Sequence, residues 1–299
     1  MEKILLDTDI GGDIDDSVCL AYLLSQPECE LKGITTVYGP TVTKAKIASA
    51  ICKAAGKDVP IVPGLRKPLM SEKNEHPLRQ AVALEKWPHD TVFPDQGAIP
   101  FMRDVIRKYP GEITLLGIGT MTNIGLLFAT DPEIPSLLKQ LVVMCGLYTD
   151  RTPRLERLPL EWNAYSDPYA TAIVYKAPLK ICRSVGTDVT YRVIMNKNEV
   201  LKRFTAEILK PVLDFAEPYF EHIAKTNYSN RIIFHDPLAA AVIFDPDICV
   251  FKRGTVEIEL ESSRLKGFTH WKEDPDGIHE VALEVDSNRF FEHYFSIVK

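Results

Sequence analysis

Short apolar runs recur along the first 185 residues, and glycines or polar residues follow most of them. Segments of helical character separate these runs, for example residues 17–24, 43–55 and 97–109. The apolar runs cover residues 4–6, 31–38, 60–63, 112–117, 141–146 and 179–185. Such runs are typical of buried parallel strands, and their alternation with helices is typical of a helix-covered sheet. We therefore predict an α/β fold of the Rossmann-related kind, with a mostly parallel central sheet flanked by helices.

The rest of the chain is less regular. Its pattern predicts a long helical region from about 198 to 226, strand-like runs at 255–260 and 281–285, and a last amphipathic helix. Residues 65–96 carry several prolines without clear periodicity, and about 147–160 forms a second predicted loop. Long loops inside compact domains are often functional or mobile. Neither a linker-like change of composition nor an internal repeat interrupts the chain, so we predict a single domain over residues 1–299.

Composition excludes several classes of function. Hydrophobic residues make up 45% and charged residues 25% of the 299 residues, which is ordinary for a soluble globular protein. The formal net charge of −6 gives no sign of a nucleic-acid or membrane partner. Neither an apolar span of about 18 residues nor a signal-peptide pattern is found, so we expect a cytoplasmic location.

The six cysteines are scattered along the chain, and no two of them form a C-x-x-C pair. Most lie within apolar runs, which is typical of small core residues in a reducing compartment. We therefore expect neither a zinc site nor a disulfide framework. The residues are Cys19, Cys29, Cys52, Cys145, Cys182 and Cys249.

Five aspartates follow the first apolar run within ten positions, with a Gly-Gly pair among them. They are Asp7, Asp9, Asp13, Asp15 and Asp16. Ligands of open α/β sheets bind outside the carboxyl ends of the strands, where this cluster is expected to lie. An N-cap role accounts for Asp15 or Asp16 alone, and water or lysines could offset the remaining repulsion. A hard divalent cation is the more economical explanation, because Ca²⁺ and Mg²⁺ take oxygen ligands of this kind.

Other predicted strands also end in polar or glycine-bearing turns. These turns lie at residues 36–39, 119–123 and 144–146. The carboxyl ends of parallel strands meet at one edge of a sheet, so we expect these turns to converge near the aspartates. Four further polar residues lie next to such ends, namely Glu161, Asn163, His235 and Asp236.

In this order the motifs resemble the nucleoside hydrolase family, the calcium-dependent N-ribohydrolases of the inosine-uridine-preferring type. The resemblance covers nearly the whole chain. It rests on Asp7-Thr8-Asp9 with Asp15-Asp16, Gly33-Ile34-Thr35-Thr36-Val37, Gly119-Thr120-Met121-Thr122-Asn123, Met144-Cys145-Gly146, Glu161-Trp162-Asn163 with Asp167-Pro168, and His235-Asp236-Pro237-Leu238-Ala239. It implies a nucleoside-hydrolase-like fold and an enzyme of nucleoside salvage that cleaves the N-glycosidic bond of a ribonucleoside. Family members are commonly dimers or tetramers, so a homo-oligomer is expected.

The resemblance also assigns roles to single residues. Asp9, Asp16 and Asp236 correspond to Ca²⁺ ligands, together with the backbone carbonyl of Thr122. Asp15 is similar to the carboxylate that takes a proton from the calcium-bound water, and His235 to a general acid for the leaving base. Four residues match family positions that hold the ribose or support the site, namely Asp7, Met144, Glu161 and Asn163. An alternative for His235 is a residue at a helix start that is hydrogen-bonded to a backbone carbonyl.

This chemistry is coherent without the family. Cleavage of an N-glycosidic bond passes through an oxocarbenium-like transition state, as in glycoside hydrolysis. A metal ion orients the attacking water and lowers its pKa, and a neighbouring carboxylate acts as general base. A histidine with a near-neutral pKa can protonate the departing base.

Three departures from the family pattern bear on the substrate. The segment between the aspartates is longer by two residues, which makes Asp13 a competitor of Asp15 for the role of base. Pro40 stands where the family has an asparagine, and Leu155 is the nearest position to a second missing asparagine that holds the 5′ side of the sugar. One alternative to an ordinary ribonucleoside is therefore a substrate with an altered 5′ side or a modified base. A second alternative is that the activity is weak or lost.

Two other functions are compatible with parts of the sequence. An apolar strand followed by Asp7-Thr8-Asp9 also resembles the Mg²⁺-dependent aspartyl-phosphate phosphatases, with Gly186-Thr187-Asp188 as an imperfect second motif. A Ca²⁺- and ribose-binding homologue without turnover is the other alternative.

Most of the remaining aromatic and imidazole side chains are expected to have structural roles. Packing is expected for Trp162, Tyr165, Tyr219, Tyr228 and Trp271, although the family places base-contacting helices near Tyr219 and Tyr228. His76 lies in the long loop, from which it could reach a substrate. Surface positions are expected for the histidines other than His235, namely His76, His89, His222, His270, His279 and His293.

Overall fold

The computed structural model describes residues 1–70, 78–149, 159–224 and 230–299, and within these ranges nine strands form one sheet. From edge to edge their order is β10-β9-β11-β6-β5-β4-β1-β2-β3. The strands are β1 (Glu2–Thr8), β2 (Cys29–Thr36), β3 (Ile61–Pro63), β4 (Ile113–Gly117), β5 (Gln140–Met144), β6 (Cys182–Val185), β9 (Cys249–Ile258), β10 (Thr269–Glu273) and β11 (His279–Val285).

The sheet is parallel from β3 through β11, and only β9 and β10 at one edge are antiparallel. The mostly parallel sheet predicted from the apolar runs is thus confirmed. After β1 the chain adds β2 and β3 on one side and then crosses to β4 on the other side of β1. In open α/β sheets, ligands bind at the carboxyl ends of the strands where the order reverses in this way. The turns after β1 and β4 therefore lie at the expected position of a site.

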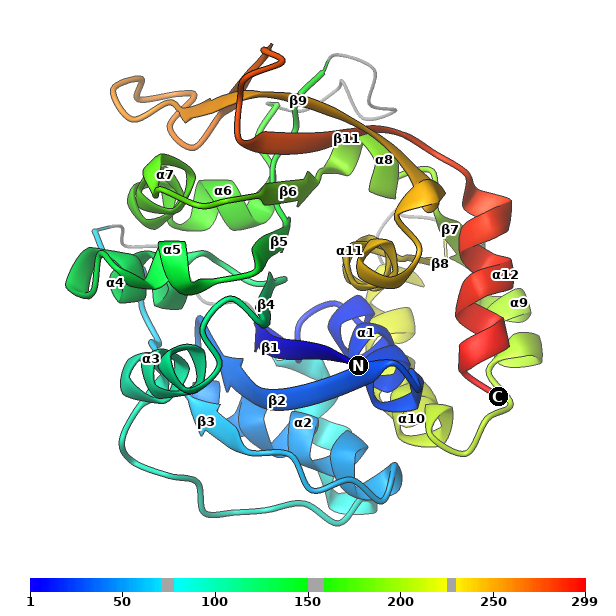
Figure 1. Ribbon diagram of the computed structural model, residues 1–299. Coiled ribbons are helices and arrows are strands. Elements are labelled where there is room, and N and C mark those ends of the chain that lie inside the picture. Colours follow the sequence, from blue (N-terminus) through cyan, green and yellow to red (C-terminus); the bar gives the residue numbers. More distant parts are fainter. Residues whose placement is uncertain (71–77, 150–158, 225–229) are drawn as a thin grey trace.

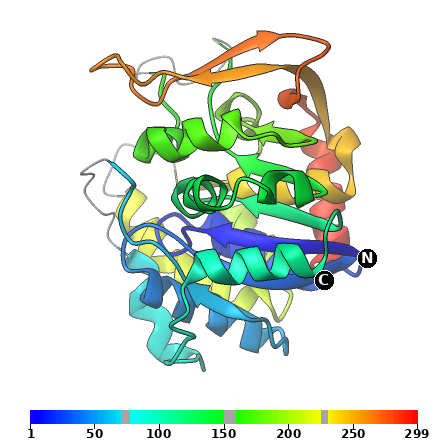
Figure 2. The ribbon, with the colours of Figure 1, turned by 60° about the vertical axis from the view of Figure 1, so that its left-hand side comes forward.

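Helices cover both faces of the sheet, as Figures 1 and 2 show. One face packs against α1 (Asp15–Ser25), α2 (Thr41–Ala54), α10 (Leu209–Ala224), α11 (His235–Phe244) and α12 (Ser287–Ile297). The other face packs against α3 (Ala98–Lys108), α4 (Thr122–Thr130), α5 (Ile134–Leu137) and α7 (Pro168–Lys176). The remaining elements are η1 (Arg79–Lys86), α6 (Trp162–Ser166), α8 (Thr187–Thr190), β7 (Ile194–Asn196), α9 (Lys197–Arg203), β8 (Arg231–Ile233) and η2 (Pro246–Ile248).

The central strands are buried on both sides because alternate side chains point to opposite faces of a strand. Leu6 and Val142 belong to the core under α1, whereas Leu5 and Val143 belong to the core under α4. All four side chains have no exposed surface. This two-sided burial explains why the strands read as continuous apolar runs rather than as an alternating pattern.

The helical region predicted from about 198 to 226 is not one helix. It is divided into α9 and α10, with residues 204–208 between them. Pro211 lies in the first turn of α10, and a proline ring clashes with the carbonyl four residues earlier in a continuous helix. A proline is tolerated in the first turn of a helix, so Pro211 is compatible with a start of α10 at Leu209, and α10 itself continues through Pro218. The apolar periodicity alone did not show the break between α9 and α10.

Some predictions on loops and histidines also change. Residues 65–96 contain the short helix η1, which the irregular pattern did not reveal. The expected surface position of His279 is wrong, because its ring is buried between the backbone N–H of Val256 and the carbonyl of Tyr175, each at 2.9 Å. The interpretations of His76, Leu155 and Tyr228 concern positions outside the described residues.

The core position predicted for most cysteines is confirmed, since all except Cys29 are buried. Among the helices of the described ranges, none combines the length and the apolar composition needed to span a membrane.

Candidate active site

The turns that follow β1, β2 and β4 meet closely at Gly119. A Cβ atom at position 119 would lie 2.8 Å from the nitrogen of Asp9 and 2.7 Å from Cγ1 of Val37. Both distances are shorter than an ordinary van der Waals contact, so a larger residue would push the turns apart. Glycine at this position therefore allows the residues after β4 to approach Asp9.

The aspartate-rich turn between β1 and α1 is held in place by a side chain from η1. Gln80 is completely buried, and its Nε2 donates a hydrogen bond to the carbonyl of Asp13 at 2.6 Å. Its Oε1 accepts a hydrogen bond from Ser17 Oγ, in the first turn of α1, at 2.8 Å. Within the turn, Gly11 has φ +115°, a left-handed conformation that glycine adopts at little cost. Sequence reasoning missed Gln80 because it lies in the stretch without periodicity.

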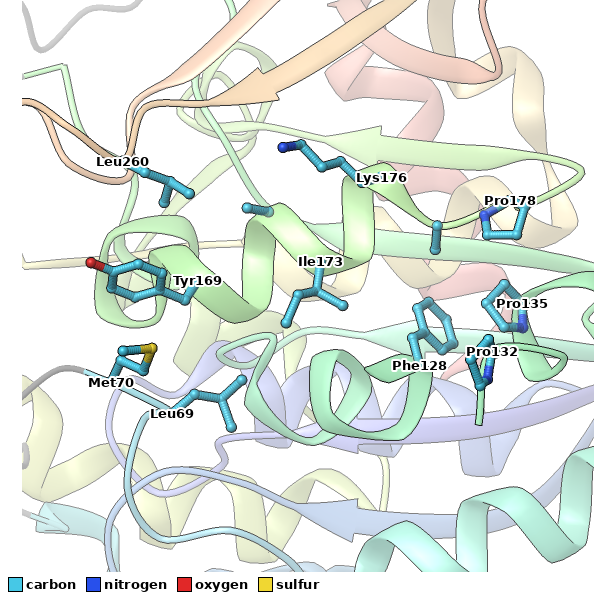
Figure 3. A pocket seen from close by; sticks show the side chains of 12 residues that line it. Leu69, Met70, Phe128, Pro132, Pro135, Tyr169, Ile173, Lys176, Pro178 and Leu260 are labelled. Atoms are coloured by element: carbon cyan, nitrogen blue, oxygen red, sulfur yellow. The ribbon is translucent and has the colours of Figure 1, made fainter. Parts of the chain in front are cut away.

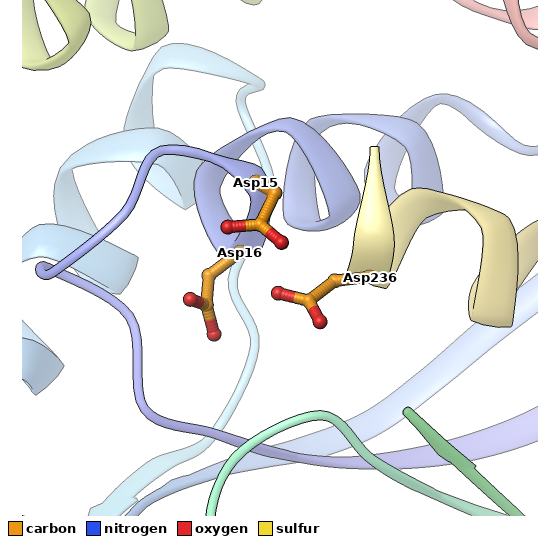
Figure 4. A group of neighbouring side chains, drawn as sticks. All are labelled: Asp15, Asp16 and Asp236. Atoms are coloured by element: carbon orange, nitrogen blue, oxygen red, sulfur yellow. The ribbon is translucent and has the colours of Figure 1, made fainter. Parts of the chain in front are cut away.

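Three aspartates from distant parts of the sequence face one another at this edge of the sheet (Figure 4). Asp15 and Asp16 belong to the first turn of α1, and Asp236 is the second residue of α11. One carboxylate oxygen of each lies within 4.8 Å of the others, and all three side chains are buried. The three residues are called the aspartate trio below. They meet because α1 and α11 cover the same face of the sheet and pack against each other.

Burial and mutual repulsion disfavour the ionised forms of the aspartate trio. Burial, followed by the negative charges of Asp13 and Asp9, raises the pKa of Asp15 to about 8. Burial, followed by the charges of Asp9 and Asp15, raises the pKa of Asp16 well above its usual range. Burial, followed by the charges of Asp15, Asp16 and Asp9, does the same for Asp236. A cation among these oxygens would favour the ionised carboxylates. The trio therefore has the donor set and the electrostatic demand of a site for a hard divalent cation.

The other two predicted metal ligands lie outside the trio. Asp9 is half-buried, and its negative charge raises the pKa of all three trio members. Thr122 is the first residue of α4, and its Oγ1 donates a hydrogen bond to Asp167 at 2.8 Å. The structure thus brings Asp16 and Asp236 together with Asp15 and with Asp9 nearby, and it anchors Thr122 at the start of α4.

Two polar side chains contact the aspartates from neighbouring elements. Thr8 at the end of β1 donates a hydrogen bond from Oγ1 to Oδ1 of Asp16. Lys44 in the first turn of α2 donates from Nζ to the backbone carbonyl of Asp9. The charge of Lys44 lowers the pKa of Asp16, in opposition to the larger effect of burial. The sequence suggested that lysines could offset the aspartates, but it gave no means of selecting Lys44.

Asp7, at the end of β1, is buried and only partly satisfied. Its Oδ1 accepts hydrogen bonds from Thr35 Oγ1 at 2.6 Å and from Asn123 Nδ2 at 2.7 Å. Its Oδ2 has no hydrogen-bond partner within the described part of the chain. Burial, which outweighs these hydrogen bonds, raises the pKa of Asp7 to about 7. The position therefore offers a buried acceptor that can also hold a proton near neutral pH.

Glu161 joins the end of β5 to the start of α6. Its carboxylate accepts hydrogen bonds from the backbone N–H groups of Gly146 at 2.9 Å, Asn163 at 2.7 Å and Ala164 at 3.0 Å. Burial raises the pKa of Glu161, and these three N–H groups oppose that rise. The side chain therefore orders the turn after β5 in addition to presenting a carboxylate.

Asn163 ties the turns after two strands to each other. Its Nδ2 donates hydrogen bonds to the carbonyl of Ile118, after β4, and to the carbonyl of Met144, the last residue of β5, both at 3.0 Å. The sulfur of Met144 lies 3.6 Å from the same nitrogen. Asn163 and Met144 are both buried, so these predicted substrate-binding residues lie together beside the switch point.

His235 is half-buried at the start of α11, immediately before Asp236 of the trio. Its Nδ1 lies 2.6 Å from Thr190 Oγ1, and the ring of Tyr191 packs edge-on against it with centroids 5.3 Å apart. These contacts restrict the orientation of the imidazole. The hydroxyl of Thr190 is the partner at Nδ1, where the sequence had suggested a backbone carbonyl as one alternative.

Asp13, the other candidate for the base, differs from Asp15 in its surroundings. Its side chain is exposed, whereas Asp15 is buried within the trio. Asp188, on which the phosphatase alternative depended, is buried in α8 and accepts hydrogen bonds from the backbone of Tyr148 and Thr149. It is not among the aspartates that meet at the switch point, so the structure does not favour that alternative.

The turn after β2 has an unusual backbone. Tyr38 has φ +63°, which is rare for a bulky residue outside functional or strained turns. Its ring packs edge-on against Trp162, with centroids 6.2 Å apart. Pro40 precedes the first residue of α2 and offers no side-chain amide at the position where the family pattern has an asparagine. This part of the site is therefore apolar and aromatic rather than amide-bearing.

A separate groove lies on the outer surface of α4, α5 and α7 (Figure 3). It has a volume of about 520 Å³, and apolar side chains such as Leu69, Phe128 and Ile173 line it. None of the aspartates discussed above contributes to it. The groove is therefore distinct from the acidic cluster at the switch point.

The chain is similar to known proteins over nearly its whole length. Residues 4–292 match the sequence profile of a family described as inosine-uridine preferring nucleoside hydrolase. An inosine-uridine preferring nucleoside hydrolase from Crithidia fasciculata is 29% identical over 308 residues, covering 97% of this chain and 95% of the other. Uridine nucleosidase 1 from Arabidopsis thaliana is 27% identical over 273 residues, covering 87% of this chain and 79% of the other.

A solved structure extends the likeness to three dimensions. The purine-preferring ribonucleoside hydrolase from Gardnerella vaginalis superimposes with a TM-score of 0.87 at 25% identity, covering 99% of this chain and 98% of the other. The names of these relatives agree on the class of bond and differ on the preferred base.

Proposed function

We propose a mechanism for this chain from the premise that it belongs to the inosine-uridine preferring nucleoside hydrolase family and is a nucleoside N-ribohydrolase. Such an enzyme adds water across the bond between the sugar C1′ and the base nitrogen. The oxygen of water is transferred to C1′, and the base leaves with a proton. Groups that accept a proton from water, stabilise an oxocarbenium-like sugar and protonate the base are therefore required.

Ca²⁺ is the cofactor that we propose, and the aspartate trio is the observation that carries the proposal. Asp9, Asp16 and Asp236, with the carbonyl of Thr122, are the proposed ligands. When bound, the ion would polarise water and vicinal ribose hydroxyls as a Lewis acid and template. Buried carboxylates that repel one another support this assignment, since they are stable in ionised form only next to positive charge.

Asp15 is the proposed general base. It lies buried beside Asp16 and Asp236, and a cation held by those two residues would keep its carboxylate ionised and able to accept a proton. The proton removed from the attacking water is transferred to its carboxylate. The exposed Asp13 lacks this environment, which supports Asp15 over Asp13.

His235 is the proposed general acid. Thr190 fixes one ring nitrogen, and Tyr191 packs against the imidazole, so a proton can be presented in a defined direction. The base nitrogen takes this proton as its bond to C1′ breaks. A histidine suits this step because its unperturbed pKa lies close to neutral pH.

The sugar is the proposed ligand of the groups at the ends of β1 and β5. The unsatisfied Oδ2 of Asp7 can accept a hydrogen bond from a ribose hydroxyl. Glu161 and Asn163 are proposed to hold or support the ribose, and Met144 to line its pocket. Pro40 and the aromatic contact of Tyr38 with Trp162 support tolerance of a less polar 5′ side.

A ribose-release assay tests this function. Purified protein is incubated with common ribonucleosides, 5′-modified nucleosides and base-modified nucleosides, each with Ca²⁺ and with the chelator EGTA. We expect free ribose and free base in equal amounts with at least one substrate, and loss of activity in EGTA. Release of phosphate from sugar phosphates, or nucleoside binding without ribose release over the whole panel, would contradict the proposal.

For the setting of this activity, we propose nucleoside salvage in the cytoplasm by a homo-oligomer, a dimer or a tetramer. The family membership supports the metabolic role. Light scattering coupled to size-exclusion chromatography measures the molar mass, and a value equal to one chain of 33.7 kDa would contradict the oligomer.

A further inference from the structure

Lys44 is a buried lysine in an unexpected place. Only 4% of its surface is exposed, and it lies in the first turn of α2. The positive end of a helix dipole is at the N-terminus, so a cation is electrostatically unfavourable there. Lysines are almost never fully buried unless they are paired. Some compensating interaction must therefore hold this side chain inside the protein.

That compensation comes from the aspartates. The Nζ of Lys44 donates a hydrogen bond to the backbone carbonyl of Asp9, and its charge lowers the pKa of Asp16. Asp9 in turn interacts with all three members of the aspartate trio. The ammonium group of Lys44 therefore acts in two ways. It binds the backbone carbonyl of Asp9 in the turn after β1, and its charge favours the ionised form of Asp16.

We propose that Lys44 is a resident counter-charge and a positioning residue of the aspartate trio. This inference rests on the proposed function, because it concerns the same cation site. The lysine fixes the Asp9 carbonyl and offsets part of the repulsion among the carboxylates, so the turn keeps its shape when no divalent cation is bound. The same positive charge repels an incoming Ca²⁺. Lys44 thus stabilises the protein without calcium and weakens the affinity for calcium.

Three substitutions separate the charge from the hydrogen bond. Lys44→Met removes both, Lys44→Gln keeps a donor without the charge, and Lys44→Arg keeps the charge. Lys46→Met is the matched control, because Lys46 lies two residues further along α2 and is more exposed. If Lys44 only supported the structure, its removal would weaken calcium binding. Tighter binding by Lys44→Met therefore distinguishes a counter-charge from a purely structural lysine.

Calcium titration by calorimetry and thermal unfolding in EGTA provide the measurements. We expect Lys44→Met and Lys44→Gln to bind calcium about tenfold more tightly, about 1.4 kcal/mol, with Lys44→Arg and Lys46→Met close to the wild type. In EGTA, Lys44→Met should melt several degrees lower, and saturating calcium should reduce that difference.

The outcomes distinguish this inference from the function on which it rests. Calcium affinity of Lys44→Met that is unchanged or weaker, with normal binding by the wild type, would overturn the role of Lys44 alone. A tighter Lys44→Met with an unchanged Lys44→Gln would reduce Lys44 to a hydrogen-bond donor and overturn the counter-charge. Absence of calcium binding by the wild type would overturn the proposed cofactor together with this role.

Discussion

Asp16 and Asp188 are both almost completely buried, with 5% and 1% of their surface exposed, but their surroundings differ in character. Asp188 accepts hydrogen bonds from the N–H groups of Tyr148 at 2.9 Å and Thr149 at 2.8 Å, and from Thr149 Oγ1 at 2.7 Å. Asp16 accepts one from Thr8 and otherwise faces other carboxylates, so burial and repulsion raise its pKa.

Whether a buried carboxylate requires a proton or a cation depends on the groups that face it. N–H donors stabilise an ionised carboxylate, and Asp188 therefore anchors the chain after β5 with protein groups alone. Glu161 also accepts hydrogen bonds from three backbone N–H groups, which oppose the rise of its pKa caused by burial. Carboxylates that face one another must take up protons or bind a cation. The aspartate trio is thus a site where the protein's own groups do not fully neutralise the carboxylates, so that a bound cation would stabilise them.

The largest effect is expected for Asp15→Asn, which removes the proposed base and keeps the shape of the trio. Turnover in a ribose-release assay should fall ~10²–10⁴-fold, while affinity for ribose by calorimetry stays largely intact. Asp13→Asn is the control, because Asp13 is in the same turn but exposed. Normal turnover of Asp15→Asn would remove Asp15 from the role, and loss of turnover only in Asp13→Asn would transfer it to Asp13.

The next largest effect is the loss of bound calcium, which is expected for Asp16 and not for Asp188. Asp16→Ala should lose bound calcium, whereas Asp188→Ala should retain it, because only Asp16 belongs to the trio. Elemental analysis after dialysis measures the calcium content. In EGTA, Asp16→Ala should melt no lower than the wild type, since the substitution removes repulsion. Equal calcium content in the two variants would show that the two classes of carboxylate do not differ in this way.

A smaller effect on stability is expected for Asp188→Ala. The substitution leaves the buried N–H group of Tyr148 and the partly buried N–H group of Thr149 without this acceptor, which should cost about 1–3 kcal/mol. Urea unfolding in EGTA measures the free energy of unfolding apart from calcium binding. Stability equal to that of the wild type would mean that solvent satisfies these donors, and that Asp188 is not an anchor.

The smallest effect concerns His279, a buried group that resembles Asp188 in having protein partners. Its Nδ1 accepts the N–H of Val256, and its Nε2–H donates to Tyr175, so protonation would break the first bond. Burial lowers the pKa of His279 in the folded protein below its usual 6.5. Because the unfolded chain takes up the proton first, stability should decline as the pH falls from 6.5 toward the lower folded pKa.

His279→Gln keeps an acceptor and a donor without a titrating ring, so its stability should depend less on pH over that range. The free energy of unfolding at several pH values measures the difference, with His270→Gln as an exposed control. A pH dependence identical to that of the wild type would exclude His279 as its source.

The sheet and the acidic residues at the end of its first strand were predictable from local patterns. The apolar run before Asp7 and the alternation of strands and helices predicted a parallel sheet with carboxylates at a strand end, and the structure has that sheet. Local hydrophobic patterns did not predict two kinds of feature, namely residues in irregular stretches and contacts that depend on strand order. Gln80 lies in a stretch without periodicity, and apolar spacing did not show the break at residues 204–208 between α9 and α10. The buried state of His279 depends on the antiparallel edge of the sheet, which local alternation does not specify.

By itself, the sequence determined the parallel strands, their alternation with helices and the residue types at the strand ends, because periodicity and turn chemistry act over a few residues. Only the tertiary structure decided that Asp15 and Asp16 face Asp236, more than 200 positions away, and that Lys44 points inward to Asp9. Distances of a few ångströms between such residues depend on strand order and on the packing of α1 with α2 and with α11. That packing is set by burial of the whole core, which no local pattern encodes.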